Sequence, residues 1–397
     1  MVRSLGLLMA GLCAGAGLLA HAAAPTVSNV RASQRPGTKL VDILYNLSDP
    51  DSSALSVLLQ VSADGGATWT VPARSFSGAV GGGVAPGLDK AVVWNAGADW
   101  DGQFTSQCRV NVLADDSDPQ GLVWIPAGTF DMGDTFNEGE SFERPVHSVP
   151  LSGFQIEKAE VSKALWDSVY RWALTRGYGF SNAGAGKGTA HPVQTVNWFD
   201  AVKWCNARSQ SEGRTPAYYT DSTLTNVYKT GQTAPYVKWD ASGYRLPTEA
   251  EWEKAARGGL SGKRFPWGDT VTHLQANYSS RTNEYYDLSP TRGYHPTYAT
   301  GGMPYTSPVA SFSPNGHGLF DLAGNVWEWC WDWFAGGWYS NAGATQPDPR
   351  GPSTGSLRII RGGGWGSNAN YLRCAARYYS MPTDAYPDVG FRCVRGQ

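Results

Sequence analysis

Residues 243–253 read Gly-Tyr-Arg-Leu-Pro-Thr-Glu-Ala-Glu-Trp-Glu. Thr248 and Glu251 have the spacing of a capping box, so a helix is predicted to begin directly after Thr248. The glycines at 258 and 259 are expected to end it, because glycine readily takes the left-handed conformation that follows many helices. Ser162 and Asn197 indicate two further helix starts, since each precedes apolar residues at helical spacing.

The sequence around these helices is rich in glycine and tryptophan. Its 397 residues include 48 Gly, 24 Pro and 17 Trp. With 32 Lys+Arg against 34 Asp+Glu, it lacks the strong positive charge typical of nucleic-acid-binding proteins, and no nucleic-acid partner is expected. Many large rings among many glycines indicate a loop-rich fold with a core filled by indole rings. Such a fold needs metals, disulfides or stacked rings to hold its loops.

The first 24 residues have the pattern of a signal peptide. A positive start is followed by an apolar run at 5–19 and by small residues at 20 and 22–24. The run is shorter than the roughly 20 residues that cross a bilayer, so no membrane span is expected after signal removal. We therefore expect export to the periplasm, the cell surface or the medium.

Residues 25–116 differ from the rest of the sequence in composition and residue pattern. β-branched runs at 39–45, 55–61 and 91–94 alternate with turn signals, and the segment has no histidine. Such spacing predicts an antiparallel β-sandwich of immunoglobulin or fibronectin type. Residues 117–120 are expected to be a linker, and residues 121–397 a second domain.

The second domain contains a series of distinctive strings in a fixed order. They include Trp-Ile-Pro-Ala-Gly-Thr-Phe-Asp-Met-Gly at 124–133, the stretch at 243–253, Phe-Pro-Trp-Gly at 265–268, Gly-Asn-Val-Trp-Glu-Trp at 324–329 and Gly-Phe-Arg-Cys at 390–393. Together these strings resemble the formylglycine-generating enzyme (sulfatase-modifying factor) family. The resemblance implies an α+β, C-type-lectin-like fold with little regular secondary structure.

The resemblance also raises the question of copper. Members that make formylglycine oxidise a cysteine of a sulfatase with oxygen and a copper(I) ion held by two cysteines, and thiolates are ligands that copper(I) prefers. The equivalent stretch here, 364–372, reads Gly-Trp-Gly-Ser-Asn-Ala-Asn-Tyr-Leu and contains no cysteine. Copper is therefore not expected. The alternative is a substitute pair formed by Cys330 and Cys374.

Signal removal would leave an odd number of cysteines, and the residues alone do not give their pairing. The resemblance implies a disulfide between Cys205 and Cys393. It also implies that Cys374 is a structural half-cystine, for which Cys330 is the candidate partner. Two buried free thiols are the alternative for this second pair.

Structural calcium is a further implication of the resemblance. Asp321 and Glu328 would supply carboxylate oxygens, and Gly324 and Val326 backbone carbonyls, as a hard cation requires. A second site would begin at Asn277 with the carbonyl of Tyr278, and Asp287 is a guess for its acidic ligand. The alternative is a turn in which Asp321 caps local backbone.

A ligand groove is expected near the missing copper site, and its candidate residues are Trp365, Asn368, Asn370, Arg377 and Asp388. Arg377 would hold a ligand carboxylate or pair with Asp384 or Asp388. These features favour an exported, calcium-stabilised module that binds a protein, peptide or glycan at the cell surface or in the periplasm. The alternative is an oxidoreductase that converts a protein cysteine to formylglycine or acts with another residue set.

Overall fold

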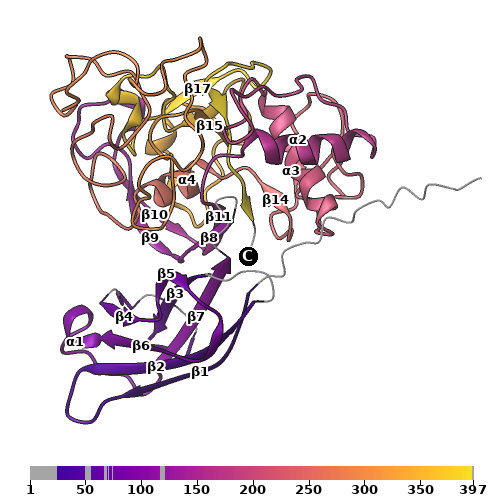
Figure 1. Cartoon of the computed structure of the whole chain (residues 1–397). Helices are drawn as coiled ribbons and strands as arrows, with labels where there is room; N and C mark the ends of the chain where they lie inside the picture. Colours follow the sequence, from indigo (N-terminus) through magenta and orange to yellow (C-terminus); the bar gives the residue numbers. More distant parts are fainter. Residues whose placement is uncertain are drawn as a thin grey trace, which may run out of the picture.

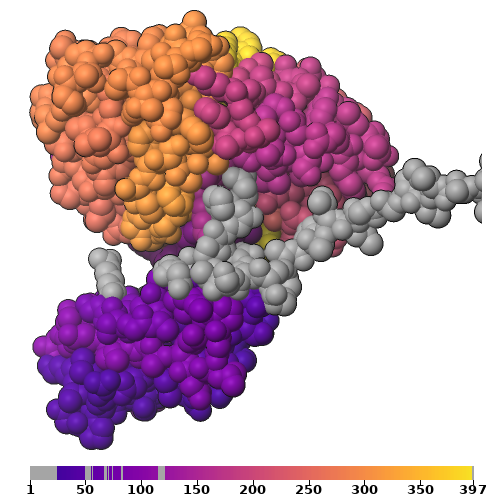
Figure 2. All heavy atoms as spheres, viewed as in Figure 1, coloured from indigo at the N-terminus to yellow at the C-terminus, as the bar shows by residue number. Residues whose placement is uncertain are grey.

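The computed structural model describes residues 25–49, 55–66, 69, 71–73, 75–116 and 121–395. The expected signal peptide, 1–24, and the expected linker, 117–120, lie outside the described residues. The described residues form two bodies that follow one another along the chain (Figure 1). Figure 2 shows both as filled volumes, the smaller one made of the indigo and purple N-terminal residues.

The N-terminal body consists of two antiparallel sheets that share one core. Their strand orders are β1-β2-β6-β4 and β5-β3-β7. The elements are β1 (Thr26–Gln34), β2 (Leu40–Ser48), β3 (Leu55–Ser62), β4 (Phe76–Gly78), β5 (Gly81–Val84), β6 (Gly87–Asn95), α1 (Ala96–Asp99) and β7 (Arg109–Asp116). Ile43 and Val92 of one sheet and Leu59 and Val112 of the other belong to one buried cluster. The three expected strand runs are confirmed as β2, β3 and β6, whereas the immunoglobulin- or fibronectin-like class stays a prediction.

A sheet of order β14-β19-β11-β8 joins the start and the end of the larger body. Its strands are β8 (Leu122–Ile125), β11 (Phe154–Glu157), β14 (Tyr244–Arg245) and β19 (Val394–Arg395). β19 lies between β11 and β14 and pairs with both, so the last described strand connects the two within this sheet. A second antiparallel pair, β9 (Gly128–Met132) and β10 (His147–Leu151), is connected through the 3-10 helix η1 (Ser141–Glu143).

Three α-helices begin where the sequence predicts them. They are α2 (Lys163–Leu174), α3 (Trp198–Ser211) and α4 (Glu249–Ala256). Ser162 and Asn197 cap α2 and α3 through their side chains. Thr248 and Glu251 form the expected capping box at α4, and Gly258 follows that helix with a φ of 57°. In the described part of the chain, no helix has the length and apolar character needed to cross a membrane.

The tryptophan-rich segment forms the strand β15 of another sheet. The order is β17-β16-β15-β18, with β15 (Trp327–Trp333), β16 (Arg358–Arg361), β17 (Tyr378–Ser380) and β18 (Val389–Gly390). The shorter elements are β12 (Tyr218–Tyr219), β13 (Tyr236–Val237), η2 (Trp338–Ser340), η3 (Ala342–Thr345) and η4 (Ala369–Leu372). Fully buried indole rings fill the core of this body, as predicted, namely those of Trp166, Trp198, Trp204, Trp252 and Trp329.

Buried ion pairs also hold the loop-rich segments. Arg361 is fully buried and pairs with both Glu249 and Glu253 of α4. Arg373 reaches Glu143 of η1 at 2.8 Å. Removing one partner of such a pair would leave a buried, uncompensated charge. These pairs therefore tie α4 and η1 to segments that lie far away in the sequence.

Candidate functional site

The loop before β15 turns tightly around residues expected to bind calcium. Asp321, Gly324 and Asn325 have positive φ angles of 56°, 88° and 66°. A Cβ atom at Gly324 would collide with the backbone carbonyl of Asn277, so glycine is required there. The backbone N–H of Asn325 donates to the same carbonyl at 2.8 Å. The structure thus places Gly324 of the first expected calcium set directly against the backbone of Asn277, which begins the second set.

Two buried side-chain oxygens at this place have no hydrogen-bond partner among the described residues. They are Oδ1 of Asp321 and Oδ1 of Asn277. The other polar atoms of both side chains are engaged. Oδ2 of Asp321 accepts from the backbone of Ala310 at 2.6 Å, and Nδ2 of Asn277 donates to the carbonyl of Tyr305 at 2.8 Å. A buried oxygen without a partner calls for an explanation, and a hard cation uses such oxygens as ligands.

Glu328 forms a buried ion pair with Arg392. Its Oε1 accepts from Nη2 of Arg392 at 2.6 Å, and its Oε2 accepts from Nε of Arg392 at 2.7 Å. Nε1 of Trp252 donates to Oε2 as well, at 2.8 Å. Both oxygens of Glu328 therefore have partners within the protein, and its expected role as a calcium ligand stays a prediction.

Glu160 adds a carboxylate to which sequence reasoning gave no role. It is fully buried, and it accepts from the backbone N–H of Val326 at 3.0 Å and from Nδ2 of Asn325 at 2.6 Å. Burial, and then the negative charges of Asp321 and Glu328, raise the pKa of Glu160 well above its usual value. Its position directly before Val161 and the Ser162 cap of α2 was the available signal.

The charges at this place are not balanced. Burial is the main cause that raises the pKa of Asp321 to about 6, and Glu328 contributes to the rise. The guanidinium of Arg392 is stabilised by Glu328, Glu160 and Asp321 together. Three carboxylates therefore act on one arginine, and their combined charge exceeds that of Arg392 when all are ionised. We call Glu160, Asp321, Glu328, Arg392 and Asn277 the carboxylate site.

Tyr278 and Asp287 are tied to each other. The hydroxyl of Tyr278 donates to Oδ1 of Asp287 at 2.6 Å, and the carbonyl of Tyr278 lies 3.2 Å from Nε2 of His273. Where the chain is described, no group of three or more His, Cys, Asp or Glu side chains could hold a metal ion. A cation at Asp321 or Asn277 would therefore need backbone carbonyls, such as those of Gly324 and Val326, among its ligands.

The four cysteines of the larger body are all fully buried, namely Cys205, Cys330, Cys374 and Cys393. The sulfur atoms of Cys205 and Cys393 lie 3.6 Å apart, as two thiols. Cys330 and Cys374 belong to one buried cluster, also as thiols. Both disulfides stay predictions.

Cys330 and Cys374 are the pair considered for a copper(I) ion. Burial raises the pKa of the Cys374 thiol to about 12 and that of Cys330 well above its usual value. Because the thiolate is the form that binds metals, both side chains would have to lose a proton to hold copper(I). The segment 364–372 offers no cysteine in their place.

Two of the five expected groove residues, Asp388 and Trp365, lie near the start of β15. The carbonyl of Asp388 accepts from the backbone N–H of Trp327 at 2.7 Å. The indole of Trp365 donates to the carbonyl of Pro387 at 3.2 Å. Asn368 is half-buried, and its side chain caps η4. Because a Cβ atom at Gly364 would lie 3.1–3.3 Å from Asp388 and Trp327, this glycine allows their close approach.

The other two expected groove residues have internal partners. Oδ1 of Asn370 accepts from Nε of Arg373 at 2.9 Å. Arg377 is 1% exposed and pairs with Glu249 through Nε at 2.6 Å and Nη2 at 2.8 Å. The expected partners Asp384 and Asp388 are thus corrected to Glu249, because α4 presents its first residue to the buried guanidinium.

Aromatic rings lie against Trp327 and against Trp365. The rings of Tyr371 and Tyr378 lie 5.6 and 5.5 Å from that of Trp327, and the ring of Tyr294 lies 5.7 Å from that of Trp365. We call these five residues the aromatic patch. Tyr378 is 41% exposed and Tyr294 43% exposed, so part of the patch faces solvent. Tyrosine supplies a large contact area at a low entropy cost, which suits ligand recognition.

Known proteins resemble this chain over the larger body. Residues 110–397 match a family described as the sulfatase-modifying factor enzyme 1-like domain, so the match begins within β7. The formylglycine-generating enzymes of Streptomyces coelicolor and Thermomonospora curvata are 38% and 37% identical to this chain. Each alignment covers 69% of this chain, and the alignments cover 89% and 93% of the two enzymes. The solved structure of Treponema denticola variable protein 1 superposes with a TM-score of 0.54 at 27% identity, over 72% of this chain and 96% of that one.

Proposed function

The chain belongs to the sulfatase-modifying factor enzyme 1-like family, and we propose that it is an exported binding member that does not generate formylglycine. The observation that carries this proposal is the absence of cysteine from 364–372, where the resemblance puts the copper ligands. The four thiols of the larger body give no substitute, because all are buried. Export is supported by the signal-like pattern of residues 1–24.

The proposed ligand surface is the aromatic patch together with Asn368 and Asp388. Tyr294 and Tyr378 would contact the ligand, since both rings are more than 40% exposed. Rings of this kind pack against the faces of sugars and of peptide side chains alike. The ligand is therefore a protein, peptide or glycan at the cell surface or in the periplasm.

We further propose that the carboxylate site binds calcium. Asp321, whose Oδ1 lacks a partner, would supply an oxygen to one ion together with Glu328 and the carbonyls of Gly324 and Val326. Asn277, whose Oδ1 also lacks a partner, would begin a second site with the carbonyl of Tyr278. The excess of carboxylates over Arg392 supports divalent cations. Such ions would hold the loop before β15 and the segment at 277–278, so their role is structural.

Cysteine oxidation is the second candidate function, and it is supported by the named activity of the two bacterial relatives. It would require Cys330 and Cys374 to act as a thiolate pair. The burial of both side chains and their raised pKa values oppose this role.

A peptide oxidation assay separates the two candidates. The protein is incubated with copper(I), oxygen and a peptide that contains Cys-X-Pro-X-Arg, and the peptide is then weighed by mass spectrometry. The Streptomyces coelicolor enzyme serves as the positive control. We expect an unchanged peptide mass. An aldehyde product that disappears in the Cys330→Ser and Cys374→Ser variants would establish the second candidate instead.

Binding is tested on arrays of glycans and peptides. We expect the protein to be retained at specific positions, and Tyr378→Ala and Tyr294→Ala to lose this retention. Tyr236→Ala is the matched control, because Tyr236 is 52% exposed on β13 and is not part of the patch. Retention that survives both patch variants, or no retention of the unaltered protein, would contradict the proposed ligand surface.

A further inference from the structure

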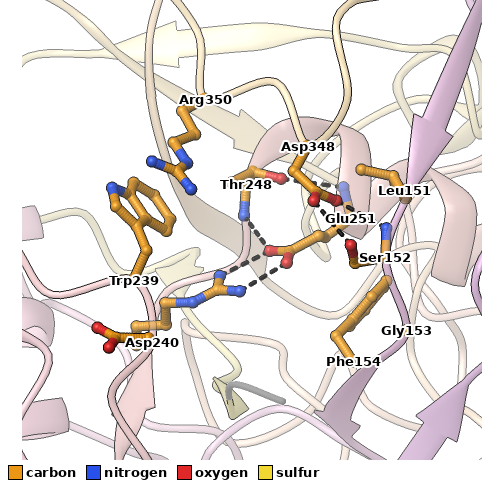
Figure 3. A pocket seen from close by; sticks show the side chains of 11 residues that line it. Leu151, Ser152, Gly153, Phe154, Trp239, Asp240, Thr248, Glu251, Asp348 and Arg350 are labelled. Carbon is orange, nitrogen blue, oxygen red and sulfur yellow. Dashed lines mark hydrogen bonds and ion pairs between the residues drawn. The ribbon is translucent and has the colours of Figure 1, made fainter.

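A second site lies outside both the aromatic patch and the carboxylate site. It is a cavity of about 450 Å³ built from five separate segments of the larger body (Figure 3). The lining residues are Leu151, Ser152, Gly153, Phe154, Trp239, Asp240, Arg245, Thr248, Glu251, Asp348 and Arg350. Cavities of this size are large enough to hold small organic ligands.

A buried ion pair forms part of the cavity lining. Arg245 donates to Glu251 through Nη1 at 2.7 Å and Nη2 at 2.6 Å, and both residues are less than 10% exposed. Glu251 also accepts from the backbone of Thr248 at 2.8 Å. Nε of Arg245 is buried and has no hydrogen-bond partner in the described part of the chain. The ion pair with Glu251 therefore leaves the Nε–H group of Arg245 without a hydrogen-bond acceptor among the described residues.

The remaining acids of the cavity already have partners. Asp348 accepts from the backbone N–H of Ser152 at 2.7 Å and from its hydroxyl at 2.8 Å, so both carboxylate oxygens are engaged. Asp240 pairs with Lys238 at 2.9 Å. Neither acid is paired with the second arginine of the cavity, Arg350.

Arg350 is an exposed cation that lies over an aromatic ring. Its guanidinium carbon lies 4.0 Å from the ring centre of Trp239, and that ring is in turn fixed edge-on against Trp331. Figure 3 shows Arg350 and Trp239 on one side of the cavity and Asp348 with Ser152 on the other. No ion pair or hydrogen bond of Arg350 is formed with any residue that the structure describes. Partial burial, and then the charge of Arg245, lower the pKa of Arg350, whereas the charges of Asp348 and Glu251 act in the opposite direction.

We propose that this cavity binds a ligand with a carboxylate group, and that Arg350 is the residue that docks it. A guanidinium stacked on a ring keeps its N–H edge free, and that edge matches the planar carboxylate. Asp348 and Glu251 would repel a doubly charged phosphate more strongly than a singly charged carboxylate, and this favours a carboxylate ligand. The buried apolar side chains of Leu151 and Phe154 provide contacts for the carbon skeleton.

The test compares an acid with its neutral counterpart. N-acetyl-L-leucine and N-acetyl-L-leucinamide are titrated into the full protein and followed by saturation-transfer NMR and calorimetry. We expect saturable binding of the acid and at least about tenfold weaker binding of the amide, because the amide cannot form a charge-assisted pair with a guanidinium. Inorganic phosphate is expected to compete less well than acetate.

Variants assign the binding to Arg350. Arg350→Gln is expected to weaken binding of the acid about tenfold or more, and Arg350→Lys is expected to recover only part of it, since it keeps the charge but loses the planar fork. Arg176→Gln is the matched control, because Arg176 is another exposed arginine over an indole ring, 5.5 Å from Trp172. Equal binding of acid and amide, unchanged binding to Arg350→Gln, stronger competition by phosphate, or no saturation up to about 10 mM would each overturn the proposal.

Discussion

Arg358 shows how this fold accommodates a buried charge with aromatic rings. Its guanidinium carbon lies 3.7 Å from the ring centre of Trp198 and 3.3 Å from that of Trp333, and the residue is fully buried. Nη1 donates to the carbonyl of Trp331, whereas Nε and Nη2 have no hydrogen-bond partner among the described residues. Burial lowers the pKa of Arg358 to about 9. The rings therefore take the place that an acidic partner has at Arg361.

Substitution of Arg358 separates its charge from its shape. Arg358→Lys is expected to lower the free energy of unfolding by about 2–3 kcal/mol, because an ammonium group is strongly hydrated and cannot lie flat between two indoles. Arg358→Met is expected to stay within about 1 kcal/mol of the unaltered protein, since an apolar side chain fills the slot without a buried charge. Urea denaturation measures both values. A lysine variant as stable as the original would contradict this view.

Asp332 is a buried acid whose ionisation is unfavourable in the fold. Burial, and then the charge of Glu249, raise its pKa to about 8, far above the ordinary carboxyl value of about 4. The folded state therefore binds a proton more tightly than the unfolded state. The stabilising contribution is complete below pH 4, and it is lost as the pH rises through about 8.

Asp332→Asn should remove this pH dependence. The asparagine keeps an oxygen that can accept from the backbone of Glu249, as Oδ2 of Asp332 does at 2.9 Å. Unfolding free energies measured from pH 5 to pH 9 should fall more steeply for the unaltered protein than for the variant. Parallel curves for the two proteins would mean that Asp332 does not titrate in this range.

At the scale of elements, the start of α4 depends on a local cap. Oγ1 of Thr248 accepts from the backbone of Glu251 at 3.2 Å. Thr248→Ala is expected to cost about 1 kcal/mol of unfolding free energy, whereas Thr248→Ser keeps the oxygen and should cost a few tenths at most. Chemical denaturation distinguishes the two variants. Equal losses in both would show that the methyl group of Thr248, and not its hydroxyl, stabilises the helix.

The parts of the fold that were predictable are those set by neighbouring residues. The starts of α2, α3 and α4 follow from the capping residues Ser162, Asn197 and Thr248 and the residues directly after them. The partner of Arg377 is Glu249, 128 residues away, so no local pattern could indicate it. The cavity at Arg350 was missed for the same reason, because its five segments meet only after folding.

The carboxylate site was predictable in part. Asp321 and Asn277 followed from the family resemblance, and both have an oxygen without a partner. Glu160 lies 165 residues from Asn325, to which it is bonded, and no spacing rule connects them. The pairing of Glu328 with Arg392 was likewise hidden, because it depends on how the last strands fold back onto β15.

At the scale of the whole molecule, the two bodies have separate buried clusters. The apolar core of the N-terminal body consists of residues between 43 and 112, and the clusters of the larger body contain none of them. Each body can therefore unfold in a transition of its own. A ligand that binds one body should shift the transition of that body alone.

Removal of calcium provides the test of this separation. If the carboxylate site binds calcium, saturation at about 100 times the Kd adds about 2.7 kcal/mol to the larger body, so a chelator should lower its Tm by roughly 5–10 °C. The transition of the N-terminal body should not move. Calcium should restore the Tm more effectively than magnesium, which requires a regular octahedron of ligands.

The variants place the effect at Asp321. Asp321→Asn should start from a lower Tm and respond little to the chelator, because it weakens the oxygen ligand that has no other partner. Asp167→Asn is the control, since Asp167 forms a surface pair with Lys163 on α2 and should leave the calcium response intact. If the chelator leaves the Tm of the larger body unchanged, the buried ion pairs of α4 and β15 hold the loops without a metal.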